Sequence, residues 1–195
     1  MKNQFNFILC LATGLLFSQK NPASSASNPI LYFEIPVGIA KQEGRSLLLG
    51  TELNYQVQKN LFSIRYLGLF EFKSFFLFIP LNVKTTNEYA LLFGKRYINQ
   101  GEAFSFSGGI SILNEQGNIG DLQYKTDYYF GFPVEINYTF FNNEKERYRI
   151  IYGLIPIGKP TAFGRSIGFK LVGNISKSSF IGFGLNLGFG WHKKY

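Results

Sequence analysis

Residues 181–195 read IGFGLNLGFGWHKKY, and this stretch decides the fold. Large apolar residues recur at every second position, with glycine or asparagine between them. In an extended strand, this spacing places the bulky side chains on one face and almost nothing on the other. The apolar face carries Ile181, Phe183, Leu185, Leu187, Phe189 and Trp191, and the other face carries Gly182, Gly184, Asn186, Gly188 and Gly190.

The composition of the whole chain also favours β-structure. Aromatic residues make up 18% of the 195 residues, glycine occurs 21 times, and there is one methionine. Aromatic and β-branched side chains suit pleated surfaces, whereas helices favour alanine, leucine and glutamate. An apolar fraction of 46% argues against disorder, so we expect an all-β fold in one domain.

Seven earlier segments repeat the alternation of the last one. Each is about as long as a tilted strand that crosses a bilayer, which needs about 9 to 11 residues. Short joins at 58–60 and 99–102 sit between long joins at 73–87 and 114–126. The sequence therefore predicts a transmembrane, antiparallel, up-and-down β-barrel. We expect eight strands, at 30–40, 46–57, 61–72, 88–98, 103–113, 127–140, 164–173 and from 181 onward.

A further segment leaves the strand number open. Residues 141–163 form a long join that contains RYRIIYGLIPIG, and this run is apolar enough to add strands. A barrel of ten strands is therefore the structural alternative. The role of residues 147–160 is not fixed by the pattern.

The polar faces of the strands indicate which side points inward. In a soluble sheet the polar face meets water and seldom carries glycine, because glycine weakens a strand. Here glycine and serine dominate that face, which suits the narrow lumen of an eight-stranded barrel surrounded by lipid. Charged residues share the same face, so we expect an ion network that plugs the lumen, built from Glu34, Glu52, Arg65, Glu71, Arg96, Glu135 and Lys170.

The amino end predicts export. Residues 1–19 combine Lys2 with the apolar run FILCLATGLLF, which is the layout of a cleaved secretory signal peptide. That run is too short to span a bilayer as a helix. Residues 20–29, KNPASSASNP, read as a flexible leader, and residues 30–195 form the barrel domain. Cys10 lies in the predicted signal, so the mature chain would have neither disulfides nor thiolate metal sites.

Two stretches, LLFGKRYINQGEAFSFSGGISI and GFKLVGNISKSSFIGFGLNLGFG, resemble small outer-membrane β-barrel proteins of Gram-negative bacteria. They are similar to uncharacterised members from Bacteroidota. The resemblance covers residues 30–195 and implies a location in the outer membrane, with outer-membrane lipid as surroundings. It also implies a carboxyl-terminal signal for the barrel-assembly machinery, formed here by Leu187, Phe189, Trp191 and Tyr195.

The net charge of +8 indicates an acidic partner. Export argues against nucleic acid. Cations in the outer connections suit lipopolysaccharide phosphates, and ordinary solvated loops are the alternative explanation for them. These cations are Lys41, Arg45, Lys73, Lys84, Lys125 and Lys177.

We expect a monomer with a structural or interaction role, without cofactor or metal and without catalysis. A soluble, secreted or periplasmic barrel that binds an apolar ligand is the alternative. A lipid-modifying enzyme is a weaker alternative, because it would need a base such as histidine, and His192 lies at the far end of the last strand.

Overall fold

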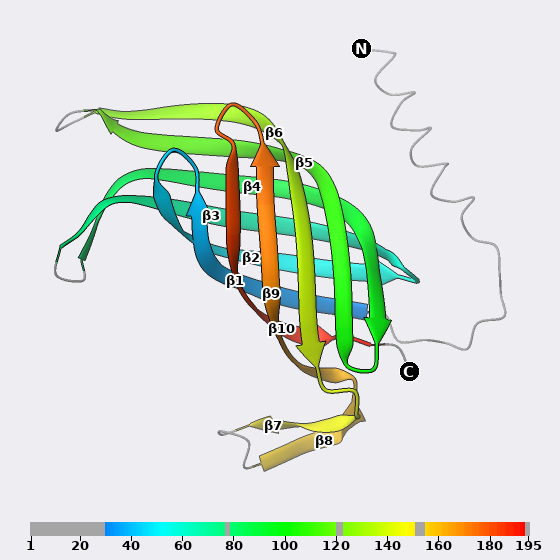
Figure 1. Cartoon of the computed structure of the whole chain (residues 1–195). Coiled ribbons are helices and arrows are strands. Elements are labelled where there is room, and N and C mark those ends of the chain that lie inside the picture. The colour runs from blue at the N-terminus through cyan, green and yellow to red at the C-terminus, as the bar shows by residue number, and fades with distance from the viewer. Residues whose placement is uncertain (1–29, 77–78, 120–122, 151–154, 194–195) are drawn as a thin grey trace, which may run out of the picture.

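The computed structural model describes residues 30–76, 79–119, 123–150 and 155–193. Within them, eight antiparallel strands close into an up-and-down barrel, as the sequence predicts (Figure 1). The final strand pairs back with the first, so the wall of the barrel is closed. In order around the barrel the strands are β1 Ile30–Lys41, β2 Arg45–Val57, β3 Asn60–Phe76, β4 Ile79–Asn99, β5 Glu102–Ile119, β6 Gln123–Phe141, β9 Phe163–Ile175 and β10 Phe180–Trp191.

The ten-strand alternative is wrong, because the additional strands lie outside the barrel wall. β7 (Glu146–Ile150) and β8 (Ile155–Thr161) pair only with each other and form a separate two-stranded sheet. β6 instead pairs directly with β9, for example Val134 with Gly173. In Figure 1 this β7–β8 hairpin extends away from the end of β6.

Two long joins expected between strands are themselves paired strands. The residues described in 73–87 and 114–126 continue β3, β4, β5 and β6, which therefore reach 17 to 21 residues. The β3–β4 and β5–β6 hairpins project past the rest of the barrel in Figure 1. Strands of this length exceed the 9 to 11 residues, approximately, that cross a bilayer. The paired backbone therefore extends well beyond the section that lipid could cover.

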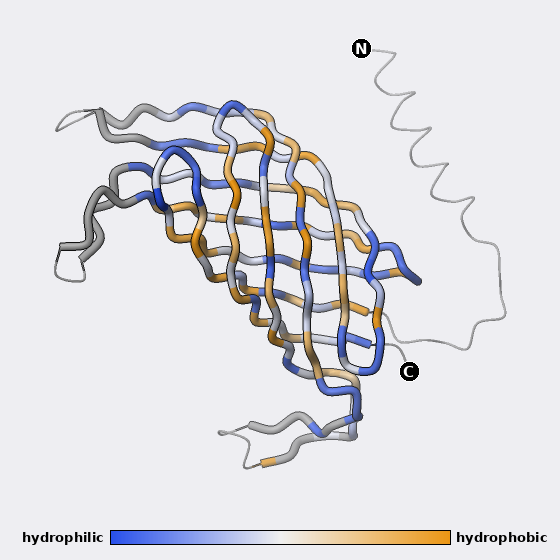
Figure 2. The backbone as a smooth tube through the Cα atoms, viewed as in Figure 1, coloured by the Kyte–Doolittle hydropathy of each residue, from blue (hydrophilic) through white to orange (hydrophobic). Residues whose placement is uncertain are grey.

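The large apolar side chains point out of the barrel. In β6, for example, Phe130, Phe132 and Val134 are exposed, whereas Glu135 and Asn137 are buried. The same alternation runs along the other barrel strands, so that apolar and polar residues follow one another in Figure 2. The interior therefore contains polar and small residues, and the exterior is an apolar surface.

Glycine on the inner face leaves room for the interior side chains. A Cβ atom at Gly182 of β10 would lie 2.7 Å from Leu48 Cδ1 and 3.2 Å from Ala40 Cβ. At Gly188 a Cβ would contact the Ser166 hydroxyl and lie 3.2 Å from His192 Cε1. The glycine face of residues 181–191 is therefore a packed surface of the lumen.

The first 29 residues lie outside the described part of the chain, so the predicted signal peptide and leader remain predictions. Among the described residues, no helix has the length and apolar character needed to span a membrane.

Candidate functional site

Lys170 of β9 lies at the centre of a charged cluster in the lumen. Its ammonium nitrogen is 2.9 Å from Glu34 Oε2, 2.5 Å from Glu52 Oε2 and 3.0 Å from Glu135 Oε1. All four side chains are at most 2% exposed. The lysine thereby joins the carboxylates of the neighbouring strands β1 and β2 to that of β6, which pairs with β9.

Arg65 of β3 extends this cluster across the lumen. Its two terminal nitrogens each lie 2.8 Å from a carboxylate oxygen, one of Glu88 on β4 and one of Glu135 on β6. Glu135 therefore connects Arg65 to Lys170. The result is a continuous ion network that ties together six of the eight barrel strands, formed by Glu34, Glu52, Arg65, Glu88, Glu135 and Lys170.

Buried amides complete the network. Asn137 Nδ2 donates to both oxygens of Glu34, at 3.1 and 3.2 Å, and Asn54 Nδ2 donates to Glu34 Oε2 at 3.2 Å. Asn174 Nδ2 donates to Glu88 and to the Ser111 hydroxyl. Hydrogen bonds to ionised groups are about twice as strong as those between neutral groups. These amides therefore help to compensate the carboxylates for the loss of water.

The three carboxylates around Lys170 have the spacing of metal ligands, since one oxygen of each lies within 4.8 Å of the others. The lysine ammonium lies within 3.0 Å of all three groups. The cation that this cluster binds is therefore the protein's own side chain.

The structure places the seven residues expected in the network at three different depths. Glu34, Glu52, Arg65, Glu135 and Lys170 come together, whereas Arg96 and Glu71 lie apart from the network. Glu71 is half-buried near Gly44 of the β1–β2 turn, and its Oε2 atom has no hydrogen-bond partner among the described residues.

Glu88 is the member of the network that the sequence analysis left out. Glu88 and Arg96 are an even number of positions apart on β4, so both side chains point into the lumen. This spacing is the sequence signal that identifies Glu88. Glu88 is the first residue of the predicted strand 88–98. The real strand begins nine residues earlier, at Ile79, so Glu88 lies in its middle.

Arg96 belongs to a second cluster, close to the ends of β4 and β10. One guanidinium nitrogen donates to Gln56 Oε1 at 2.9 Å and to the carbonyl oxygen of His192 at 3.0 Å. The guanidinium also lies 4.6 Å from the ring centroid of Tyr32 and 5.6 Å from that of Phe141. Aromatic faces attract a cation of this kind, which is how the buried arginine is stabilised without a carboxylate among the described residues.

His192, the only histidine, closes the same cluster. It follows the last residue of β10, is buried, and has its ring 5.0 Å from Tyr32 and stacked on Phe141 at 5.6 Å. Burial, and next the charge of Arg96, lower the pKa of His192 to about 3. The imidazole is therefore neutral at pH 7 and is enclosed by aromatic rings.

Two apolar clusters fill the lumen on either side of the ion network. One lies toward the β1–β2 and β9–β10 turns, and the other lies toward the start of β1 with Tyr32 and Arg96. The charged section is thus enclosed from both ends. The first cluster comprises Ala40, Leu48, Leu67, Leu69, Leu113, Val172 and Phe180, and the second comprises Ile30, Tyr32 and Leu61.

The expected carboxyl-terminal signal lies on the outer face of β10 as far as it is described. Leu187, Phe189 and Trp191 are all exposed, and Tyr195 lies outside the described residues. Lys193 turns inward, and its ammonium donates to the carbonyl oxygens of Asn142 and Glu144 at 2.7 Å each. That lysine therefore fastens the end of β10 to the connection after β6.

No protein-family model and no curated protein matches the chain. Solved structures with a similar fold include the following two. Neisserial surface protein A, NspA, matches with a TM-score of 0.54 at 9% sequence identity, over 85% of this chain and 99% of its own. The N-terminal β-barrel domain of Pseudomonas aeruginosa OprF matches with a TM-score of 0.52 at 13% identity, over 83% and 98%. At these identities the likeness concerns the fold alone, a closed barrel of eight antiparallel strands.

Proposed function

We propose that this chain is a monomeric outer-membrane β-barrel with a structural or interaction role and a plugged lumen. The carrying observation is its inverted arrangement, with large apolar side chains exposed and an ion network buried. The two solved structures that it resembles are outer-membrane barrels of Gram-negative bacteria, which supports the same location. Its membership of a Bacteroidota group stays a prediction.

The exposed aromatic residues fit the thickness of an outer membrane. Tyr128 and Tyr138 are both exposed on β6, ten residues apart. At about 3.4 Å per residue they are separated by about 34 Å along the strand, which a tilt of about 40° reduces to about 26 Å. This agrees with an apolar band of about 25 Å between two aromatic girdles. Phe130, Phe132, Val134 and Ile136 lie exposed between the two tyrosines.

The interior supports a barrel that does not conduct. The ion network crosses the lumen from β3 to β6 and from β9 to β2, and apolar clusters lie on both sides of it. Ions entering this space would have to displace side chains that are each paired. In planar bilayers we therefore expect no steady conductance from the refolded protein, and a large, stable open channel would contradict the proposal.

The location is tested separately by fractionation. We expect the full chain in the outer-membrane fraction and a folded form that migrates differently on a gel before and after heating. Recovery from the soluble periplasm would instead favour the soluble barrel with an apolar ligand. That alternative requires the aromatic residues to face inward, and the structure places them outward.

The interaction role rests on the parts that extend beyond the apolar band. The β3–β4 and β5–β6 hairpins would project from the cell surface, with the β7–β8 hairpin and the described end of β10 on the periplasmic side. Of the cations proposed to contact lipopolysaccharide, Lys84 is already paired with Glu43 and Glu115, at 3.2 and 3.0 Å. Lys84 is therefore a weak candidate for that contact.

A catalytic role in lipid modification has little support. His192 follows the end of β10, which lies at the opposite end of the barrel from the long hairpins, and its ring is enclosed by Tyr32 and Phe141. A general base must reach the proton that it abstracts. We expect His192→Ala to leave outer-leaflet lipids chemically unchanged, as mass spectrometry of extracted lipids would measure.

A further inference from the structure

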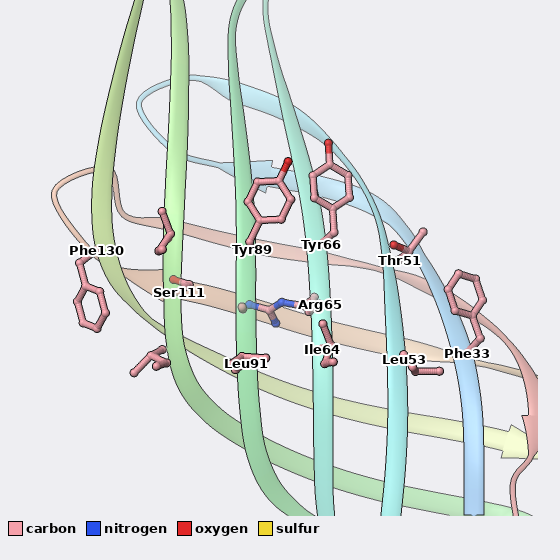
Figure 3. Close-up of a pocket in the computed structure, with 13 residues that line it drawn as sticks. Phe33, Thr51, Leu53, Ile64, Arg65, Tyr66, Tyr89, Leu91, Ser111 and Phe130 are labelled. Carbon is pink, nitrogen blue, oxygen red and sulfur yellow. The ribbon is translucent and has the colours of Figure 1, made fainter. Parts of the chain in front are cut away.

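A groove of about 490 Å³ crosses the outer face of the barrel (Figure 3). It lies between two rows of outward-facing side chains on neighbouring strands, from β1 to β6. Thr51, Tyr66 and Tyr89 belong to one row, in register on β2, β3 and β4, and Leu53, Ile64 and Leu91 belong to the next. The residues between the rows, which include Ala90 and Ser111, have their side chains inside, so the floor is close to the backbone.

The hollow exists because a small residue interrupts an outer surface that is otherwise bulky. Thr51 is exposed, and the next strand places the ring of Tyr66 opposite it. At the floor, Ala90 and Ser111 point into the lumen, where both are buried. The volume falls within the range of about 300–1,000 Å³ that small-molecule sites occupy.

The groove is lined mainly by apolar side chains, and hydroxyl groups lie along part of one border. The Tyr66 hydroxyl donates to Asn87 Oδ1 at 2.8 Å, and the rings of Tyr66 and Tyr89 lie 5.2 Å apart with their hydroxyls directed the same way in Figure 3. Together with the Thr51 hydroxyl, they form a polar border on the side of the long hairpins. Ile64 and Leu91, both exposed, form the opposite wall within the apolar band. A ligand that suits this groove has an apolar chain and a polar group at one end.

We propose that this groove binds one acyl chain of a membrane lipid, with the ester region of that lipid at the hydroxyl groups of Thr51 and Tyr89. The proposal rests on the outer-membrane location, because the groove opens onto the surface that lipid would surround. Such a lipid has a polar ester at one end of a hydrocarbon chain. The ester would lie at the hydroxyl groups of the border, and the chain would lie along the apolar part of the groove. A second barrel is a poorer occupant, because its convex wall would touch both rows of side chains without reaching the floor between them.

The test compares a variant that fills the groove with a matched variant elsewhere on the wall. Thr51→Trp places a large ring in the hollow, and Ile167→Trp adds the same ring to β9, where Ile167 is exposed outside the groove. Each full-length protein is refolded in detergent with dioleoyl phosphatidylethanolamine, and the number of retained lipids is measured by native mass spectrometry. Heat-dependent gel migration shows that each variant is folded.

We expect the wild type and Ile167→Trp to keep a single phospholipid at a collision energy that removes the others, and Thr51→Trp to lose it. Equal retention by all three proteins would overturn the proposal, as would a dimer that only Thr51→Trp dissociates. Tyr89→Phe, which removes a hydroxyl at the border of the groove and keeps the ring, should shorten retention of the phospholipid more than that of dodecane. Fractionation of the same variants tests the location independently, so a failed groove leaves the outer-membrane proposal standing.

Discussion

Replacing Lys170 by methionine tests the importance of the ion network. The change keeps most of the side-chain volume but removes a cation that is at most 3.0 Å from Glu34, Glu52 and Glu135. At about 3 Å and an effective dielectric constant of about 20, each contact is worth about 5 kcal/mol before desolvation. Breaking one buried pair costs about 3–5 kcal/mol in practice, because the remaining charge has no partner. We therefore expect Lys170→Met to lower the free energy of unfolding by at least about 3 kcal/mol.

The assay is reversible urea unfolding of the barrel in lipid vesicles, followed by the fluorescence of Trp191, the only tryptophan. Lys59→Met is the matched control, because Lys59 is exposed and lies 5.6 Å from the ring centroid of Tyr97. This control should change the free energy of unfolding by less than about 1 kcal/mol.

A charge-balancing variant separates the electrostatic cost from a packing cost. Adding Glu34→Gln and Glu52→Gln to Lys170→Met removes two of the carboxylates that the methionine leaves without a cation. Neutral side chains of similar shape can replace a buried ion pair at little cost, so we expect part of the lost stability to return. If Lys170→Met unfolds within about 0.5 kcal/mol of the wild type, or if the two additional changes lower stability further, the reasoning is refuted.

Three more outcomes follow from the packing of the lumen and its rims. Gly182→Val should lower the free energy of unfolding by about 1–3 kcal/mol, since its Cβ would meet Leu48 at 2.7 Å, and Leu48→Ala in the same chain should restore part of it. The pKa of His192 is lowered to about 3 in the folded state. As the pH falls below about 6.5, the imidazole is therefore protonated in the unfolded state while it stays neutral in the folded state. Between about pH 6 and 4, the free energy of unfolding of the wild type, measured in urea, should fall by up to about 1.4 kcal/mol more per pH unit than that of His192→Asn. Equal dependence of the two free energies on pH would contradict a neutral, buried ring. Replacing the β7–β8 hairpin, 146–161, by a short glycine-serine turn should leave heat-dependent gel migration intact, because the barrel closes without it.

Parity along the strands was sufficient to predict the barrel and its orientation. The alternation of bulk and glycine in residues 181–191 assigns each side chain to the outer surface or to the lumen, and the observed faces agree with it. Strand length was harder to predict. In the projecting hairpins the two strands pair with each other and need no apolar outer face. The apolar alternation therefore stops at about Glu88, whereas β4 begins at Ile79.

Parity does not give depth, which explains the errors at the candidate site. Arg96 and Lys170 both point inward, but the tilt of the strands places one beside Tyr32 and the other at the centre of the network. Depth depends on how far each strand is shifted against the next, and the sequence pattern does not contain that shift. The sequence likewise could not predict that β7 and β8 form a separate hairpin, because an apolar run does not indicate which sheet its strand joins.

The ion network also constrains the order in which the barrel can be built. Glu34 lies on the first strand and Lys170 on the last but one, 136 positions later, so their contact must await nearly the whole chain. Until that moment the acidic groups of β1 and β2 lack their lysine and favour a hydrated environment. Assembly therefore has to finish before the interior can become dry. Interactions formed that late act mainly on the rate of opening, so weakening them should shorten the lifetime of the native barrel while hardly slowing its formation.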